Sequence, residues 1–238
     1  MLSPREEAAA LLAFKEELDL QYANDPWKFF CQQVVTKDES AEITEANKDR
    51  IYPWPKHHAY LKELLTVLQN EPLVAIPKSR RMMVSWLLSA FFVHDARYHP
   101  NGALFYMSET EQKAAFAVDK RCYFIETNLK DPAFRKTPNT SKTKTGLIGH
   151  ITYENDSYIW ALASGGDVLR QYTATRIFLD ESEFQDEAAE TVRAALPMVE
   201  NGAQLILASS SGGPVGIMAE LADAMGVKSW KDVKRLVA

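Results

Sequence analysis

The sequence has little cysteine, no long apolar run and no excess of positive charge, and each shortage argues against a class of protein. Cys31 and Cys122 have no partner at metal-ligand spacing, which argues against a zinc site and favours two buried thiols. The most apolar stretch, Trp86–Val93, is far too short to span a membrane. Acidic residues follow Ser3-Pro4, which indicates the start of a helix and not the basic flank of a signal peptide.

The formal net charge is −5, whereas proteins that bind nucleic acid mainly by electrostatics are basic. Residues 1–50 hold 6 Lys/Arg and 11 Asp/Glu, and the remaining residues hold 21 of each. Any basic surface must therefore be local. The 46% of apolar residues argues against disorder, and 238 residues suit one large α/β domain or a domain with a small appendage.

Short apolar stretches alternate with helical patterns from Leu73 onward. Strands are expected at 73–76, 103–107, 147–153, 157–163, 175–179 and 204–208. Helices are expected from the N-terminus to about 20 and at 27–35, 57–69, 82–98, 110–128 and 183–195. This alternation predicts an α/β fold with a mostly parallel central sheet flanked by helices on both faces. A hairpin turn at 153–158 adds one antiparallel pair.

The most informative segment is residues 74–85, with the sequence VAIPKSRRMMVS. A strand, a polar loop and a helix start with a hydroxyl residue form the architecture of a phosphate-binding P-loop. The pattern G-x-x-x-x-G-K-[ST] is broken, because Lys78, Met83 and Val84 replace the two glycines and the lysine, whereas Ser85 stands at the Mg²⁺-holding hydroxyl. Lys78 could supply the missing charge from the other side of the phosphates. A plain basic loop before a capped helix is the alternative.

Residues 176–181, with the sequence RIFLDE, describe a buried strand that ends in two acids. At the ligand edge of a parallel sheet, Asp180 would orient Mg²⁺ and Glu181 would polarise the attacking water. Two further segments precede or follow this strand. Arg170 stands on a loop opened by Gly165-Gly166 and could stabilise a transition state, or be a surface arginine. The serines at 209–211 follow the last strand and could sense a γ-phosphate, or form a flexible turn.

The order of these segments resembles the ATPase domain of large terminase subunits, the DNA-packaging motors of tailed phages. The resemblance covers about residues 25–216. Four segments are similar to the family's deviant Walker A, its Walker B with catalytic glutamate, its coupling motif and its adenine-side motif: KSRRMMVS, RIFLDE, ASSSGG and YPWPKHHAYL. His57 stands where the adenine-side motif carries glutamine, and the phosphate loop has no glycine. DPWKFFCQQVV is similar to the family's N-terminal segment.

The resemblance implies a P-loop NTPase of the additional-strand class that uses ATP and Mg²⁺. The nucleotide would be held by His57 and by the loop residues Lys78, Ser79, Arg80, Arg81, Met82, Met83, Val84 and Ser85. Mg²⁺ would be held by Ser85 and Asp180, with Glu181, Lys78 and the arginine finger Arg170 as catalytic residues. Coupling of hydrolysis to movement falls to Ser209, Ser210 and Ser211.

The resemblance also implies an organisation and partners. We expect an N-terminal helical lid segment at 1–50, an ATPase core at 51–226 and, at 227–238, the start of a linker towards a nuclease domain that lies outside this sequence, so no nuclease activity is expected. The implied partners are double-stranded DNA, the portal protein, the small terminase subunit and copies of the chain in a ring, a pentamer, on the procapsid. The implied location is the host cell cytoplasm, away from membranes.

DNA contacts are assigned to the most basic stretch of the sequence, residues 128–144, which is expected to be an exposed loop. Its cations are Lys130, Arg135, Lys136, Lys142 and Lys144. Two other functions stay open. One is a helicase-like P-loop ATPase. The other is a degenerate P-loop domain that serves as an assembly module, which the glycine-free loop favours and the retained Asp180-Glu181 pair opposes.

Overall fold

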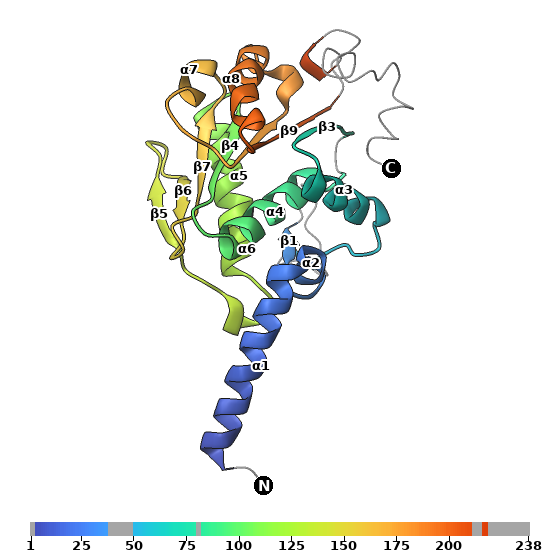
Figure 1. The fold of residues 1–238 in the computed structure, drawn as a ribbon, viewed down its shortest axis with the longest axis vertical. Helices are drawn as coiled ribbons and strands as arrows, with labels where there is room; N and C mark the ends of the chain where they lie inside the picture. Colours follow the sequence, from blue (N-terminus) through green and yellow to red (C-terminus); the bar gives the residue numbers. More distant parts are fainter. Residues whose placement is uncertain (1–2, 38–49, 80–81, 211–215, 219–238) are drawn as a thin grey trace.

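The computed structural model describes residues 3–37, 50–79, 82–210 and 216–218, and shows an α/β domain from which the first helix projects (Figure 1). The helices are α1 Pro4–Asn24, α2 Pro26–Gln33, α3 Ala59–Asn70, α4 Val84–Tyr98, α5 Glu111–Ala117, α6 Phe124–Thr127, α7 Gly166–Leu169 and α8 Ala188–Glu200. Short turns of other helix types are the π-helical η2 Val118–Tyr123 and the 3-10 turns η3 Pro132–Phe134 and η4 Ser182–Phe184. No helix within the described ranges is long and apolar enough to cross a bilayer.

The central sheet has seven strands in the order β3-β9-β8-β4-β7-β6-β5. These strands are β3 Leu73–Pro77, β4 Ala103–Ser108, β5 Asn139–Lys142, β6 Ile148–Thr152, β7 Tyr158–Ala163, β8 Arg176–Asp180 and β9 Gln204–Ser209. The pairs from β3 to β7 are parallel, and β7·β6 and β6·β5 are antiparallel. The six expected strands and the mostly parallel sheet are confirmed.

Alternate residues of the buried strands face two separate cores, because successive side chains of a strand point to opposite faces. Leu104, Tyr106 and Phe178 pack in the core under α3, α4 and α5. Phe105 and Ile177, one residue along, pack in the second core, under α7 and α8. Helices thus cover both faces of the parallel part of the sheet, which explains why its strands are continuous apolar runs.

The N-terminal segment packs on α4 through aromatic residues. Phe29 and Phe30 of α2 are buried and contact His94 of α4. A small antiparallel sheet, β1 Val35–Lys37 with β2 Ile51–Pro53, lies beside them and was not expected from the sequence. Ser3 caps α1 as predicted, in a capping box with Glu6. The apolar residues expected to form a stripe on α1 are mostly exposed, as Leu11, Leu12, Phe14 and Leu20 show.

Three expected elements differ from the structure. The helix at 110–128 contains the π-helical turn η2 between α5 and α6. The helix expected at 183–195 starts at Ala188, because Glu181 has a left-handed conformation and η4 follows it. The basic stretch 128–144 is not wholly a loop, since it contains η3 and the edge strand β5. Short polar strands of this kind lack the apolar alternation that marks a strand in sequence.

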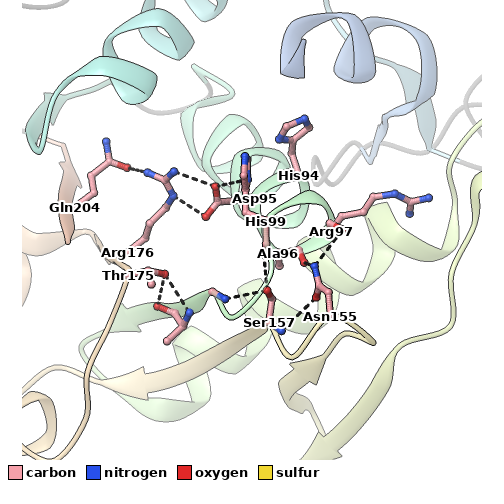
Figure 2. Close-up of polar contacts among 12 residues, drawn as sticks. His94, Asp95, Ala96, Arg97, His99, Asn155, Ser157, Thr175, Arg176 and Gln204 are labelled. Atoms are coloured by element: carbon pink, nitrogen blue, oxygen red, sulfur yellow. Dashed lines mark hydrogen bonds and ion pairs between the residues drawn. The ribbon is translucent and has the colours of Figure 1, made fainter. Parts of the chain in front are cut away.

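A polar cluster closes the sheet at the amino ends of β8 and β9 (Figure 2). We call Asp95, His99, Arg176 and Gln204 the amino-edge cluster. Arg176 of β8 donates to both oxygens of Asp95, from Nε at 2.7 Å and Nη2 at 2.9 Å, and also donates to Gln204. His99 Nδ1 lies 3.0 Å from Asp95 Oδ1. These contacts tie the end of α4 to the sheet.

Candidate active site

The candidate site lies at the opposite edge of the sheet, where the carboxyl ends of parallel strands meet. Asp180 ends β8, Ser209 ends β9 and Lys78 follows β3. The backbone N–H of Lys78 donates to the Ser209 carbonyl oxygen at 2.9 Å, which extends the β3·β9 pairing by one hydrogen bond. Ligands of open α/β sheets bind at this edge.

Lys78 points into the site and faces both acids. Its Nζ lies 2.6 Å from Glu181 Oε1 and 3.8 Å from Asp180 Oδ1, and its side chain is only 9% exposed. A buried ammonium needs such partners, because a charge that is removed from water and left unpaired is strongly destabilising. Lys78, which the sequence predicts as a displaced phosphate-binding lysine, therefore contacts the two carboxylates at the end of β8.

Glu181 is held in a defined orientation. Its backbone is left-handed, with φ 55° and ψ 44°, a conformation that costs a residue other than glycine about 1–2 kcal/mol. The Ser210 N–H and hydroxyl both donate to Glu181 Oε2, at 3.3 and 3.2 Å. Burial raises the pKa of Glu181, but the contacts with Lys78 and Ser210 outweigh burial and hold that pKa below its ordinary value. The carboxylate is therefore ionised at neutral pH.

Asp180 uses its two carboxylate oxygens differently. The Tyr106 hydroxyl of β4 donates to Oδ2 at 3.0 Å, and Arg121 Nη1 lies 4.0 Å from the same oxygen. Oδ1 is buried and has no hydrogen-bond partner among the residues that the structure describes. Burial, and then the charge of Asp180, raises the pKa of Tyr106 well above its ordinary value, so this hydroxyl keeps its proton. Gln185 Nε2 fixes the strand end by donating to the Asp180 carbonyl oxygen at 2.6 Å.

Besides Lys78 and the two acids, the site includes the start of α4. Met83, at the position of the second P-loop glycine, has φ 57°, the left-handed conformation that glycine adopts without strain. The N-cap residue Met83 makes no side-chain capping bond, so, within the described ranges, the first N–H groups of α4 have no such cap and are suited to act as donors to a ligand. Ser85 lies in the first helical turn and is half-buried, and Tyr60 holds the loop by donating to the Met82 carbonyl oxygen at 3.1 Å. Arg80 and Arg81 lie outside the described residues.

The donor set fits a nucleotide-bound Mg²⁺. The part of the chain that the structure describes has no cluster of three or more His, Cys, Asp or Glu side chains that could hold a metal alone. Mg²⁺ in phosphate-transfer sites takes one or two carboxylates together with substrate phosphates and waters, so a full protein cage is not needed. Asp180 Oδ1, which is buried and has no hydrogen-bond partner among the residues that the structure describes, fits the role of such a carboxylate oxygen.

The other residues expected in the site have contacts of their own. Arg170, which caps α7, donates to Asp167 at 2.6 Å and to Glu190. His57 is exposed, with its ring centroid 4.1 Å from that of His58. Ser209 donates nothing to the acids and instead accepts from the Glu183 N–H at 3.1 Å through its hydroxyl, and Ser211 lies outside the described residues.

The basic residues assigned to DNA lie on the far part of the sheet and the segment that precedes it. Lys142 belongs to β5 and, like Lys136 and Lys144, is exposed. Lys130 donates to the Cys31 carbonyl oxygen at 3.1 Å, and Arg135 Nε donates to the Leu129 carbonyl oxygen at 2.7 Å. Two of the five cations therefore have structural contacts within the chain.

The sequence did not reveal Tyr106 and Arg121, which face Asp180. Tyr106 is hidden in the apolar run of β4, and only the strand register, which pairs it with Phe178, brings it beside Asp180. Arg121 lies on η2, where a π-turn shifts the helix face that a sequence pattern would assign. The one feature of the sequence that could have indicated Tyr106 is its position as a tyrosine in an apolar strand, two residues before the strand ends.

Comparison with known proteins found no matching family model and no similar curated protein. Among solved structures, the large terminase of bacteriophage HK97 is similar over 86% of this chain, with 11% identity and a TM-score of 0.57. The large terminase ATPase domain of Thermus phage P74-26 is similar over 68% of this chain and 71% of its own, with 15% identity and a TM-score of 0.40. This chain spans 41% of the HK97 protein. Over most of its length, the chain therefore has the fold of a phage large terminase.

Proposed function

We propose that this chain is the ATPase domain of a viral DNA-packaging motor, which couples Mg²⁺-dependent ATP hydrolysis to movement of double-stranded DNA into a procapsid. One observation carries the proposal. On a fold shared with a large terminase, Lys78 faces the Asp180-Glu181 pair beside the uncapped start of α4. An anion-binding helix start, a buried cation and two acids at one sheet edge are the parts that phosphoryl transfer requires.

The phosphates of ATP would bind between Lys78 and the first turn of α4. Lys78 follows β3 and Met83 immediately precedes α4, and the backbone N–H groups of the first turn of α4 are donors for phosphate oxygens. Lys78 then exchanges its contact with Glu181 for a contact with the β- and γ-phosphates. A phosphate is the stronger partner, because it carries more charge than one carboxylate.

Metal binding falls to Asp180 and Ser85. When bound, Mg²⁺ neutralises charge that develops on the transferred phosphate and orients it for in-line attack. Asp180 contributes Oδ1, which is buried without a hydrogen-bond partner within the described ranges, and Ser85 contributes its hydroxyl from the first turn of α4.

Glu181 is the group that orients and deprotonates the attacking water. Its Oε1 accepts a hydrogen bond from Lys78, and phosphates that draw Lys78 away would free this oxygen for the water. The Ser210 hydrogen bonds keep the carboxylate in place during that exchange. Departure of the γ-phosphate would then be sensed by the serines at 209–211, of which Ser209 contacts Lys78 and Ser210 contacts Glu181, and these serines would couple hydrolysis to movement.

Arg170 is proposed as an arginine finger that acts on the nucleotide of a neighbouring subunit. Its side chain is 54% exposed and is held by two acids of its own chain, Asp167 and Glu190. Surface pairs of this kind are weak, so a phosphate on an adjacent copy can replace them. A guanidinium is most useful where charge builds on the γ-phosphate.

The remaining assignments concern the whole motor. They are a lid at 1–50, a core at 51–226, DNA contacts on the basic stretch 128–144, and assembly with the portal protein and the small terminase subunit in a pentameric ring inside the host cell. Residues 227–238, assigned to a linker, lie outside the described residues. The DNA contacts predict affinity that falls steeply with salt, since phosphate binding releases counterions.

The test is steady-state ATP hydrolysis with Mg²⁺, with and without double-stranded DNA. Glu181→Gln should bind Mg²⁺–ATP and hydrolyse it at least about a hundredfold more slowly than wild type. Glu154→Gln changes an exposed glutamate in the turn between β6 and β7 and is the matched control. Wild type that binds ATP without turnover would favour the assembly module, and unwinding of a duplex would favour the helicase-like alternative.

A further inference from the structure

The two oxygens of Asp180 have unequal surroundings. Oδ2 receives the Tyr106 hydroxyl at 3.0 Å and faces Arg121 at 4.0 Å. Oδ1 is buried without a hydrogen-bond partner among the described residues, and Lys78 approaches it only to 3.8 Å. A free carboxylate can rotate and exchange its oxygens, so a hydrogen bond to Oδ2 alone fixes which of the two oxygens faces Lys78 and the site.

Tyr106 is built into the core beside this carboxylate. It stands on β4, next to β8, and its ring packs edge-on against Phe178 with centroids 4.8 Å apart and against Phe92 at 6.3 Å. The side chain is 1% exposed. A buried hydroxyl that lacks a partner is costly, so the ring packing and the hydrogen bond together hold the donor at one position relative to Asp180.

Arg121 forms an ion pair with the same oxygen, at 4.0 Å. It lies on η2, the π-helical turn between α5 and α6, and its side chain is 15% exposed. Single π-turns occur often at functional sites, because the extra residue changes the direction of the side chains around it. Here the turn directs a guanidinium from a helix that follows β4 towards the end of β8.

We propose that Tyr106 and Arg121 are positioning residues that hold Oδ2 of Asp180 and thereby present Oδ1 to the nucleotide-bound metal. The inference rests on the proposed function, since it concerns the same divalent cation. Residues that orient a metal ligand commonly change metal affinity by 10- to 100-fold when they are replaced. Tyr106, with the shorter contact, should have the larger effect.

The experiment measures binding of Mn²⁺, a spectroscopic substitute for Mg²⁺, to the chain saturated with ADP. Tyr106→Phe keeps the ring packing and removes only the hydroxyl. We expect its Mn²⁺ affinity to fall about tenfold, whereas ADP binding in the presence of a chelator stays at the wild-type value. Arg121→Gln should weaken Mn²⁺ binding less, and Arg121→Lys should recover part of that loss.

Tyr98→Phe is the matched control, because Tyr98 also donates its hydroxyl to an aspartate, Asp19, at 2.8 Å, far from the site. It should leave Mn²⁺ affinity unchanged. If wild type binds Mn²⁺ with ADP and Tyr106→Phe binds it equally well, the positioning role is wrong and the proposed function stands. If wild type binds neither ADP nor Mn²⁺ with ADP, both are wrong. A lower unfolding midpoint with unchanged Mn²⁺ affinity would also overturn the inference, since it would assign Tyr106 to stability alone.

Discussion

Asp95 and Asp180 lie at opposite edges of the same sheet, and their surroundings differ. Both oxygens of Asp95 accept hydrogen bonds from Arg176, and His99 adds a further contact (Figure 2). Asp180 accepts a hydrogen bond at Oδ2, whereas its buried Oδ1 has no hydrogen-bond partner among the described residues and lies 3.8 Å from Lys78 Nζ. Around Asp180, Met83 and Glu181 also adopt left-handed backbone conformations.

The difference separates a carboxylate whose hydrogen bonds are satisfied within the chain from one that we propose as a metal ligand. The amino-edge cluster satisfies its charges within the chain, so it can stabilise the fold but has no capacity for a ligand. Within the described ranges, the site at the carboxyl edge has a buried acceptor without a hydrogen-bond partner, a helix start without a side-chain cap and two left-handed residues, which cost stability unless a ligand completes the site. The following changes are ordered from the largest expected effect on the isolated chain to the smallest.

Replacing each aspartate by asparagine is the most direct way to break the comparison. Asp95→Asn leaves Arg176 without its counter-charge and should lower the free energy of unfolding by about 3 kcal/mol, the lower end for a broken buried pair. Asp180→Asn should change it by less than about 1 kcal/mol, because Lys78 keeps its contact with Glu181 and Tyr106 still finds an acceptor. Urea unfolding of both variants measures the difference. Equal decreases in the free energy of unfolding would show that both carboxylates stabilise the fold to the same extent.

Lys78→Ala should lower the rate of ATP turnover by about a hundredfold or abolish it, because the change removes the only lysine of the proposed phosphate loop. Lys62→Ala removes an exposed lysine of α3 and is the matched control. Steady-state hydrolysis of both variants is compared with wild type. Turnover of Lys78→Ala at the wild-type rate would contradict the reading of Lys78 as the displaced phosphate-binding lysine and would leave the Lys78–Glu181 pair a structural contact.

The stability of the protein should fall in acid because of His94, which precedes Asp95 of the amino-edge cluster on α4. Burial lowers the pKa of His94 to about 4, and the hydrogen bond to the Tyr22 carbonyl oxygen only partly opposes this. Because the unfolded chain takes up the proton near pH 6.5, stability falls as the pH drops below that value, by about 2 kcal/mol at pH 5. His94→Gln should lose about 2 kcal/mol less than wild type between pH 7 and pH 5, measured by urea unfolding. His57→Gln, at an exposed position, should follow wild type.

The sequence was sufficient for the main parts of the site and insufficient for its details. Lys78, Asp180 and Glu181 could be expected together, because each follows or ends an apolar strand and parallel strands end at one edge. The strand register that brings Tyr106 to Asp180 depends on long-range pairing, which a local sequence pattern does not predict. The π-turn that carries Arg121 is not predicted by a helical sequence pattern either. The late start of α8 has a similar cause, since the left-handed Glu181 interrupts an otherwise helical pattern.

Arg170→Ala should have the smallest effect on the isolated chain. The side chain is half-exposed and pairs with Asp167 and Glu190 at the surface, so its loss should leave the midpoint of urea unfolding and the affinity for ATP close to those of wild type. This result would show that Arg170 contributes neither to the stability that the amino-edge cluster provides nor to nucleotide binding in its own chain.

The effect of Arg170→Ala should appear only in assembled rings, where turnover is lost because the γ-phosphate charge of a neighbour is no longer stabilised. Mixing Arg170→Ala with Glu181→Gln should then restore part of the activity, since some interfaces combine an intact Glu181 with an intact Arg170 from the adjacent copy. Arg193→Ala, which removes another exposed arginine paired with Glu190, is the control and should retain turnover. If well-assembled mixed rings stay inactive at every ratio, Arg170 does not act across the boundary, and Arg80 or Arg81 becomes the better assignment for the finger.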